Sequence, residues 1–435
     1  MTAGAQPLAD LEDIIRAGRA LFPDLDVIGP DGLLDLQLAH DGIRRLRVEG
    51  AHEQFLHLQS LGVDTTKGSV GRRDAKVTTS SWHKNFGDAF NSVRLLDVEH
   101  PSGTALHTGA DSPGWVELSF KKPVDLRRVR LRNVSGSTAR RLRGVRVLVE
   151  GPDGWVVVYD HLARVDQLRQ TLAAPASNGA SPELSALLPI LGDTFGGFYE
   201  EARKALDALT DVPDQQRSAF RTVVTHALLA DRAMEWTVHG PQRCFRFWTE
   251  QEKVRYIGSA VEITDALASL TPHVCFGFGA ALSVVRDGAL IPHDDDLDII
   301  IAFDPHEAST LAEGLALVEQ HLRPLGFTVT GNFSAHRHVR KPGAKHVDVF
   351  VGLFEGDVVS WYPGARGALT RDMMFPASSA PLMGVTCPLP RNPLVYLERL
   401  YGAGWRHPDP NFRHTWDRSA YADLAGGRKP ATTGS

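Results

Sequence analysis

The 435-residue sequence has only three cysteines, Cys244, Cys275 and Cys387, and no excess of positive charge. The cysteines show none of the paired spacings that build a zinc ligand set or a disulfide framework, which excludes a disulfide-stapled fold and favours a reducing compartment. Lysine and arginine number 47 against 52 acidic residues, which gives a formal net charge of -5. No overall basic charge therefore indicates a nucleic-acid partner, and none is expected.

Long hydrophobic runs are also missing. The longest largely apolar stretch covers residues 274–285, well short of the roughly 20 residues that a helix needs to span a bilayer. The first ten residues lack a basic start followed by an apolar stretch, so no export signal is expected. We expect a cytoplasmic protein without a transmembrane segment, which can associate peripherally with the inner face of the membrane.

Composition and periodicity divide the chain into segments. Apolar residues with helical spacing in residues 10–21 predict a short helix, and short alternating runs separated by turn signals predict an antiparallel β domain after it. A stretch rich in alanine, proline and serine predicts a linker. The expected segments are a helical N-terminus (1–30), the β domain (31–172), the linker (173–182), a helical region (183–255), an α+β domain (256–420) and a disordered tail (421–435).

The most informative pattern is acidic. Asp294, Asp295, Asp296 and Asp298 lead directly into an apolar, β-branched run. If that run is a buried strand, Asp296 and Asp298 point to the same face at its start. Carboxylates so placed repel each other and lose hydration energy unless a cation lies between them. Oxygen ligands of this kind suit a hard divalent ion, so the pattern predicts a Mg²⁺ or Mn²⁺ site.

A third carboxylate comes from a second apolar run. Asp348 stands between two valines, on the opposite face of the predicted strand over residues 346–351. A neighbouring strand would bring it to the pair, so Asp296, Asp298 and Asp348 are the predicted metal ligands. The alternative for an aspartate-rich loop is a solvated turn or a helix N-cap. The adjoining buried strand favours the metal site.

Positive charge lies close to these acids in the chain. The guanidinium of Arg286, between a glycine segment and the aspartates, would bind a phosphate through two hydrogen bonds. The alternative, a pair with Asp287 or with an acid of the cluster, stays open. The basic run over residues 336–346 either lies near a nucleoside diphosphate or is a solvated loop, and none of its residues is assigned a role.

Residues 279–298, with the order Gly-x-x-Leu, Arg, Ile-Pro-x-Asp-Asp-Asp-x-Asp, resemble the signature of the LicD and fukutin-related phosphotransferases, which have the nucleotidyltransferase fold. Asp348 resembles the third carboxylate of that family, and residues 393–402 with Trp405 and Pro408 resemble its closing helix and turn. The resemblance covers about residues 255–410. It departs from the family pattern at Ala280, where serine or threonine is common, and at His293, where tryptophan is common.

The resemblance implies a transfer of a phospho-alcohol or polyol phosphate, such as phosphocholine, ribitol phosphate or glycerol phosphate, from a CDP-linked donor to a hydroxyl of a surface glycan or glycolipid. Metal ions and basic groups catalyse such transfers without a covalent nucleophile. It implies that Asp296 and Asp298 hold the metal on the donor diphosphate and that Asp348 completes the site and draws the acceptor proton. Asp294 would be an accessory acid, while Gly279, Arg286 and His293 would contact substrate and phosphate.

Residues 60–165 resemble discoidin or coagulation-factor C-type domains, which are galactose-binding-like jelly-roll sandwiches. Trp82, His83 and Phe86 are weak candidates for glycan binding, and the alternative is that they pack in the core or at an interface. The basic stretch over residues 120–150 would meet an anionic glycan or a membrane surface, or is a solvated sheet face. The expected fold is therefore multidomain, an antiparallel β-sandwich followed by an α+β nucleotidyltransferase-fold domain with helical additions.

Two other functions stay open. The first is a nucleotidyltransferase that moves a nucleoside monophosphate from a nucleoside triphosphate to a small alcohol or sugar. The second is a catalytically silent glycan-binding protein, which the complete set of three metal carboxylates disfavours.

Overall fold

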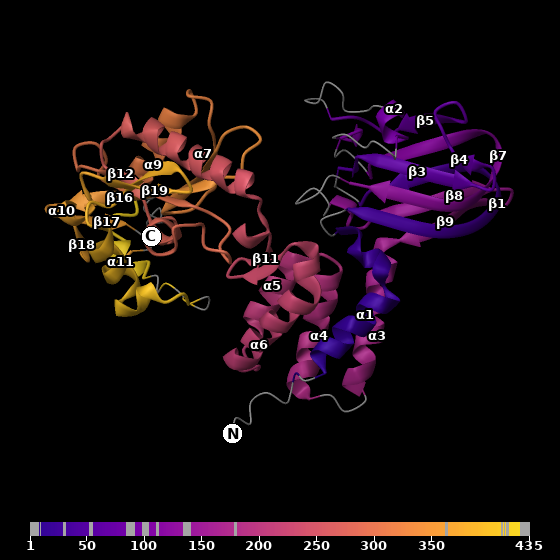
Figure 1. Cartoon of the computed structure of the whole chain (residues 1–435), viewed down its shortest axis with the longest axis horizontal. Coiled ribbons are helices and arrows are strands. Elements are labelled where there is room, and N and C mark those ends of the chain that lie inside the picture. The colour runs from indigo at the N-terminus through magenta and orange to yellow at the C-terminus, as the bar shows by residue number, and fades with distance from the viewer. Residues whose placement is uncertain are drawn as a thin grey trace, which may run out of the picture. The chain divides into compact units, whose positions relative to one another are not determined.

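A computed structural model divides the chain into two compact units, residues 1–243 and 244–435 (Figure 1). It describes residues 8, 10–28, 32–51, 55–83, 92–97, 104–109, 113–133, 141–177, 181–361, 364–409, 412, 414 and 417–426. Each unit has its own cluster of buried apolar side chains. Among the described residues, no helix is both long and apolar enough to cross a membrane.

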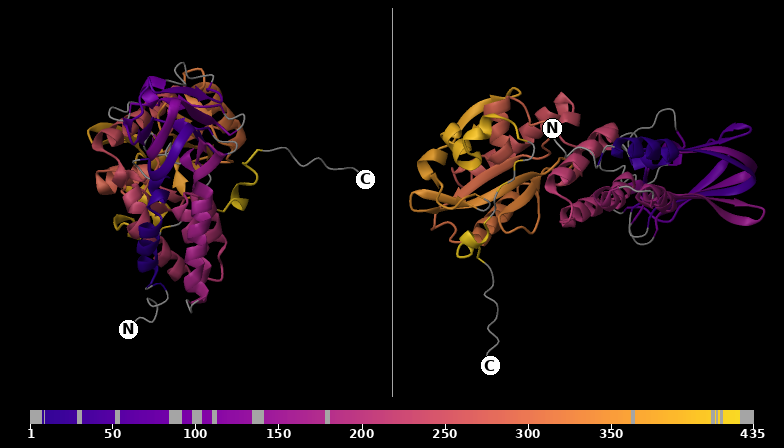
Figure 2. Two further views of the ribbon diagram at one scale, coloured as in Figure 1. Left: turned by 90° about the vertical axis from the view of Figure 1, so that its right-hand side faces the viewer. Right: turned by 90° about the horizontal axis from the view of Figure 1, so that it is seen from below.

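Two long strands organise the β part of the N-terminal unit. Strand β1 (Leu33–Glu49) pairs antiparallel with β7 (Trp115–Arg132) along nearly its whole length, with shifts of register between Gln37 and Arg45. These irregularities divide the sheet into two halves that share the long strands (Figure 2). The other strands are β2 (His57–Leu58), β3 (Ser60–Thr65), β4 (Gly68–Ser69), β5 (Ala75–Thr79), β6 (Leu106–His107), β8 (Arg146–Gly151) and β9 (Gly154–Asp160).

Alternation along these strands explains the sheet. Leu34, Leu46 and Val48 of β1 are buried, as are Val129 and Leu131 of β7, while the residue on each side of them is more exposed. The sheet order is β4-β3-β7-β1-β8-β9, β5 pairs with β7, and a small sheet joins β2 to β6. All these pairings are antiparallel, which confirms the expected antiparallel β-rich region. Its discoidin-like identity stays a prediction.

The basic stretch over residues 120–150 is paired with acids across the strands. Arg128 forms an ion pair with Asp35, and Arg130 lies 3.0 Å from Asp64. Arg146 is likewise 3.3 Å from Glu49. Much of the positive charge counted along the sequence is therefore neutralised by neighbouring strands.

Helices complete the N-terminal unit, and they depart from the expected boundaries. Helix α3 (His161–Ser177) runs from the end of β9 into the expected linker, because buried Leu168 and Leu172 anchor one face of it. The expected helical region also contains a hairpin of β10 (Glu235–Thr237) and β11 (Gly240–Gln242). The remaining elements are α1 (Leu11–Leu21), η2 (Pro23–Ile28), α2 (Ser92–Leu95), α4 (Pro182–Phe195), α5 (Tyr199–Ala208), α6 (Asp214–Val224), η4 (Thr225–Leu229) and η5 (Ala230–Arg232).

The C-terminal unit is built on a mixed sheet, labelled in part in Figure 1, with the order β12-β13-β16-β15-β14. Strands β13 (Asp298–Phe303) and β16 (Val347–Glu355) run parallel to each other, and the other pairings are antiparallel. Residues 299–303 are all buried, as expected for a strand covered on both faces. The other strands are β12 (Val274–Phe276), β14 (Thr328–Thr330), β15 (His336–Arg340), β17 (Val358–Trp361), β18 (Leu369–Thr370) and the hairpin β19 (Ser378–Leu382) with β20 (Val385–Leu389).

Helix α7 (Glu250–Ala268) opens this unit after a single turn, η6 (Phe245–Phe247). Thr249 and Glu252 form a reciprocal capping box at its start, which stabilises the first turn. The other helical elements are α8 (Phe278–Leu282), η7 (Ser283–Asp287), α9 (Leu311–Leu322), α10 (Arg371–Met374), α11 (Pro393–Tyr401), η8 (Ala403–Arg406) and η9 (Ser419–Tyr421). The expected tail from residue 421 is ordered as far as residue 426, because Leu311 and Ala312 donate backbone hydrogen bonds to Leu424 and Ala425. Residues 427–435 lie outside the described residues.

Candidate functional site

Two predicted carboxylates meet at the start of the parallel strand pair. Asp298 is the first residue of β13, and its Cα partner on β16 is Asp348. Residues that are partners on adjacent strands project to the same face, so both carboxylates lie on one side of the sheet. The Asp348 backbone N–H donates to the carbonyl of Leu297 at 2.9 Å, and the Asp298 carbonyl accepts from Gly277 at 2.9 Å. These backbone hydrogen bonds therefore fix the position of both acids along their strands.

The loop that carries Asp294, Asp295 and Asp296 is anchored by hydrogen bonds to η6 and α7. The Phe245 N–H donates to the Asp294 carbonyl at 2.8 Å. The hydroxyl of Tyr256 accepts from the Leu297 N–H at 3.1 Å and donates to the His346 carbonyl at 2.6 Å. One buried tyrosine thus links the acidic loop to the residue that precedes β16.

The acids raise one another's pKa. Burial raises the pKa of Asp294 and of Asp298 well above the ordinary range, and the negative charge of Asp296 is the second cause. Burial followed by the charges of Asp296 and Asp295 raises the pKa of Asp348 to about 8. Asp348 is 8% exposed, and its Oδ1 atom has no hydrogen-bond partner. Ionised, this cluster would concentrate negative charge in a place of low hydration, which is the condition that a bound cation relieves.

Gly279 lies against the acids, and its expected contact with substrate and phosphate stays a prediction. A Cβ atom there would stand 2.5 Å from Asp294 Oδ2, so a side chain would displace that carboxylate. The Gly279 backbone N–H also hydrogen-bonds to Asp298 and lowers its pKa, against the raising effect of burial. The preceding residue, Phe278, has a positive φ of 40°, and its N–H donates to the Tyr396 hydroxyl at 2.9 Å. Helix α11, the expected closing helix, thereby holds the glycine turn in place.

Arg286 pairs with Asp287, which is the alternative to phosphate binding that the sequence left open. Its guanidinium bonds to both carboxylate oxygens of Asp287, at 2.9 and 2.8 Å, and donates to the Trp405 carbonyl at 3.2 Å. A cation that does reach the acidic loop is Lys345, whose Nζ lies 3.3 Å from Asp295 Oδ2. His293 is half-buried beside Asp294 in the chain. Phosphate binding by Arg286 or His293 stays a prediction.

Two residues that sequence reasoning left without a role lie at the site. His336 Nε2 and His338 Nε2 are each 3.5 Å from an oxygen of Asp348. The three ligand atoms of this group all lie within 4.8 Å of one another, whereas the predicted set of three aspartates is not among such groups within the described residues. The signal in the sequence is the spacing His-x-His, which places both rings on one face once the segment forms a strand.

The three aromatic candidates of the β domain have different environments. Trp82 is 64% exposed. The His83 ring packs against His107, with ring centroids 4.7 Å apart, and against Phe55 at 5.5 Å. Phe86 lies outside the described residues. Trp82 therefore keeps the geometry of a surface contact, while His83 is part of a ring cluster.

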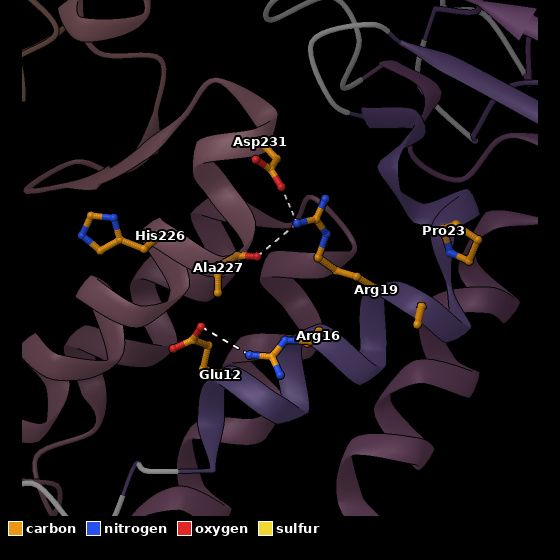
Figure 3. Close-up of a pocket in the computed structure, with 8 residues that line it drawn as sticks. Glu12, Arg16, Arg19, Pro23, His226, Ala227 and Asp231 are labelled. Atoms are coloured by element: carbon orange, nitrogen blue, oxygen red, sulfur yellow. Dashed lines mark hydrogen bonds and ion pairs between the residues drawn. The ribbon is translucent and has the colours of Figure 1, made fainter.

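A separate hollow of about 560 Å³ lies in the N-terminal unit, between α1 and the turns η4 and η5 (Figure 3). Its arginines are already paired: Arg19 with Asp231 and with the Ala227 carbonyl, and Arg16 with Glu12 at 3.5 Å. The described residues that line this hollow do not form an acidic cluster like that of the C-terminal unit.

Comparison with known proteins agrees with the C-terminal site. A search of curated proteins found no match to the chain. Residues 273–392 match a family model described as LicD/FKTN/FKRP, nucleotidyltransferase domain, and the match includes all four candidate aspartates. It gives no support for a discoidin-like N-terminal domain. For residues 273–392 the match supports the LicD family, a phosphotransferase and nucleotidyltransferase-like family that acts on glycans.

Proposed function

We propose that the C-terminal unit is a metal-dependent phosphotransferase that moves a phospho-alcohol or polyol phosphate from a CDP-linked donor to a hydroxyl of a surface glycan. The observation that carries the proposal is the meeting of Asp298 and Asp348 on parallel strands beside the acidic loop. The family match over residues 273–392 supports the same class of reaction.

The acids are ligands of the type that a hard divalent cation prefers. Asp348 Oδ1 is a buried oxygen without a hydrogen-bond partner, and Asp294 and Asp298 have raised pKa values from burial and from neighbouring acids. Asp296, Asp298 and Asp348 would hold Mg²⁺ or Mn²⁺, which prefer carboxylate ligands. When bound, the ion would neutralise the charge of the donor diphosphate.

The residues of the chain would then position and deprotonate the acceptor. In the transfer, the acceptor oxygen forms a bond to the phosphorus that bears the alcohol, and the bond from that phosphorus to the bridging oxygen breaks, so that CMP leaves. The hydroxyl proton would pass to the ionised carboxylate of Asp348, which lies on the same face of the sheet as Asp298. Lys345, whose Nζ lies 3.3 Å from Asp295, adds positive charge beside the acidic loop.

The N-terminal unit would bind the acceptor or the membrane surface. Exposed Trp82 offers an aromatic face for a sugar ring, which is the contact expected of a glycan-binding loop. We place the reaction in the cytoplasm at the inner face of the membrane, where a CDP-linked donor and a growing glycan or glycolipid would meet.

Release of CMP tests this function. The full chain is incubated with CDP-choline, CDP-ribitol or CDP-glycerol, with Mg²⁺ and a capsular or teichoic-acid-type acceptor, beside the variants Asp298→Asn and Asp304→Asn. Asp304 follows the far end of β13 and pairs with Arg371, so it is a matched control. We expect CMP release that needs Mg²⁺ and is lost only in Asp298→Asn. Pyrophosphate release from a nucleoside triphosphate would instead favour the nucleotidyltransferase, and no turnover with any nucleotide would favour the silent glycan-binding protein.

A further inference from the structure

The face of β15 next to the acidic cluster carries a nitrogen-rich ligand group. His336 and His338 are two positions apart on β15 (His336–Arg340), so both rings project to the same side of the sheet. The Cα partner of His338 on the antiparallel neighbour β16 is Asp348, so the carboxylate lies on the same face of the sheet as both rings. Backbone pairing alone therefore brings two imidazoles and one carboxylate together.

The distances fit ligands that share an ion better than hydrogen-bonded partners. His336 Nε2 lies 3.5 Å from Asp348 Oδ2, and His338 Nε2 lies 3.5 Å from Oδ1. Two atoms bound to one tetrahedral ion at about 2.0–2.1 Å are about 3.4 Å apart. A hydrogen bond between nitrogen and oxygen is shorter, about 2.7–3.2 Å. Asp348 Oδ1, in a side chain only 8% exposed, has no hydrogen-bond partner and faces this group.

The rings are held in place by neighbouring aromatic side chains. His336 stacks on Phe333, with centroids 4.3 Å apart and planes 10° from parallel, and contacts Phe350 at 4.7 Å. His338 stacks on His346 at 4.3 Å. Packing that restricts the imidazoles lowers the entropy cost of binding an ion, which is how the surroundings of metal sites are built.

We propose that His336, His338 and Asp348 form a binding site for a divalent transition-metal ion, which shares Asp348 with the proposed donor site but takes its other two ligands from β15 rather than from Asp296 and Asp298. Two imidazole nitrogens with one carboxylate select Zn²⁺, Co²⁺ or Fe²⁺ over Mg²⁺, because nitrogen ligands bind these ions more strongly than they bind a hard cation. Three protein ligands leave at least one position open to water or substrate oxygen. Asp348 belongs to both ligand sets, so the site rests in part on the proposed function.

Co²⁺ is the probe, because its visible absorption reports nitrogen ligation without any turnover. The full chain, without an affinity tag and stripped by chelator, is titrated with Co²⁺ at pH 7.5. We expect one equivalent that gives a visible band, that resists a thousandfold excess of Mg²⁺ and that is displaced by Zn²⁺. Displacement of the band by Mg²⁺ would overturn the site.

Variants separate this site from the catalytic cluster. The double variant His336→Gln and His338→Gln should lose the band, while His306→Gln, an exposed histidine elsewhere in the unit, should keep it. Asp298→Asn should keep the band even though it abolishes transfer, so failure of the proposed function and failure of this site are distinguishable. Loss of the band in Asp298→Asn, or its survival in a folded double variant, would overturn the proposal. If the double variant does not fold, the single variant His338→Gln must lower Co²⁺ affinity at least tenfold.

Discussion

Asp298 and Asp348 are register partners on the two parallel strands of the C-terminal sheet, β13 and β16. Each carboxylate contributes to a buried negative site in which the pKa of both acids is raised. A fold selected only for stability would gain by replacing one of them with an apolar residue, because uncompensated buried charge is costly. Their pairing is therefore the feature that function has to explain, and a bound cation explains it.

The first prediction concerns the metal ligands. Asp298→Asn should lower CMP release at least roughly 100-fold, the loss expected when one group that stabilises the transition state is removed. Stability without metal should stay equal or rise, because the change removes one of several repelling carboxylates. Steady-state kinetics and thermal melting in chelator check the two parts, with Asp304→Asn as the control.

The second prediction concerns pH. The folded-state pKa of Asp348, about 8, lies above the ordinary value of 3.8, so the folded chain binds the proton more tightly than the unfolded chain does. Its ionisation should cost stability progressively as pH rises from about 4 to about 8, and that cost should be absent at lower pH. In chelator, Asp348→Asn should therefore gain melting temperature relative to the unaltered chain at pH 8 but not at pH 4.5.

The titration of several histidines changes the stability of the fold with pH in the opposite direction, which is why the comparison uses a variant. Burial, for example, lowers the pKa of His57 to about 4 and of His414 to about 4, and such groups, which have no recorded contact with Asp348, favour the folded state as pH rises. They are present in both chains and cancel in the difference. A gain from Asp348→Asn that did not depend on pH would contradict the raised pKa of Asp348.

The third prediction uses the close approach of Gly279. Gly279→Ala should displace the Asp294 carboxylate, because the new Cβ would stand 2.5 Å from its Oδ2 atom. We expect a cost of about 1–3 kcal/mol in the free energy of unfolding and a fall in kcat. Gly258→Ala is the matched control: no atom stands within 4 Å of a Cβ there, and alanine in the middle of α7 should stabilise by about 0.5–1 kcal/mol.

The fourth prediction concerns the tyrosine that links the acidic loop to β16. Tyr256→Phe removes two hydrogen bonds and leaves the Leu297 N–H and the His346 carbonyl unpaired by that hydroxyl. We expect a loss of about 1–3 kcal/mol, since buried groups then lack a partner. Urea unfolding measures it. The Tyr159 hydroxyl donates to a single carbonyl at 3.5 Å, so Tyr159→Phe should lower the free energy of unfolding by less. Equal losses would show that the two hydrogen bonds of Tyr256 contribute no more than the one long bond of Tyr159.

Some of the site was predictable from local pattern alone. The buried run after Asp298 and the valines around Asp348 have the composition of strands, and both segments are strands in the structure. Thr249 and Glu252 likewise mark the start of α7, because a capping box is a local signal.

What could not be predicted depends on register and on distant partners. Nothing local in residues 336–346 indicates that His338 pairs with Asp348, since the alignment of β15 on β16 is set by the whole sheet. Arg286 had two compatible partners in the sequence, and the fold selected Asp287. Helix α3 was missed as a whole, since residues 161–172 were expected in the β domain and the following residues in the linker; it is anchored by burial of Leu168 and Leu172, which composition does not reveal.

The last prediction separates the two units. Buried apolar residues form one cluster within residues 8–236 and another within residues 245–421, and no residue belongs to both. Each cluster can therefore stabilise its own unit, so a chain of residues 244–435 should fold cooperatively and keep its hydrolysis of the CDP-linked donor. It should lose most of its kcat/KM on a polymer acceptor, because acceptor binding is assigned to the N-terminal unit. Melting of the shortened chain, with donor hydrolysis and polymer transfer measured side by side, decides the matter. An equal loss of both activities in a folded chain would contradict the accessory role, since a unit that only binds acceptor leaves the donor site intact.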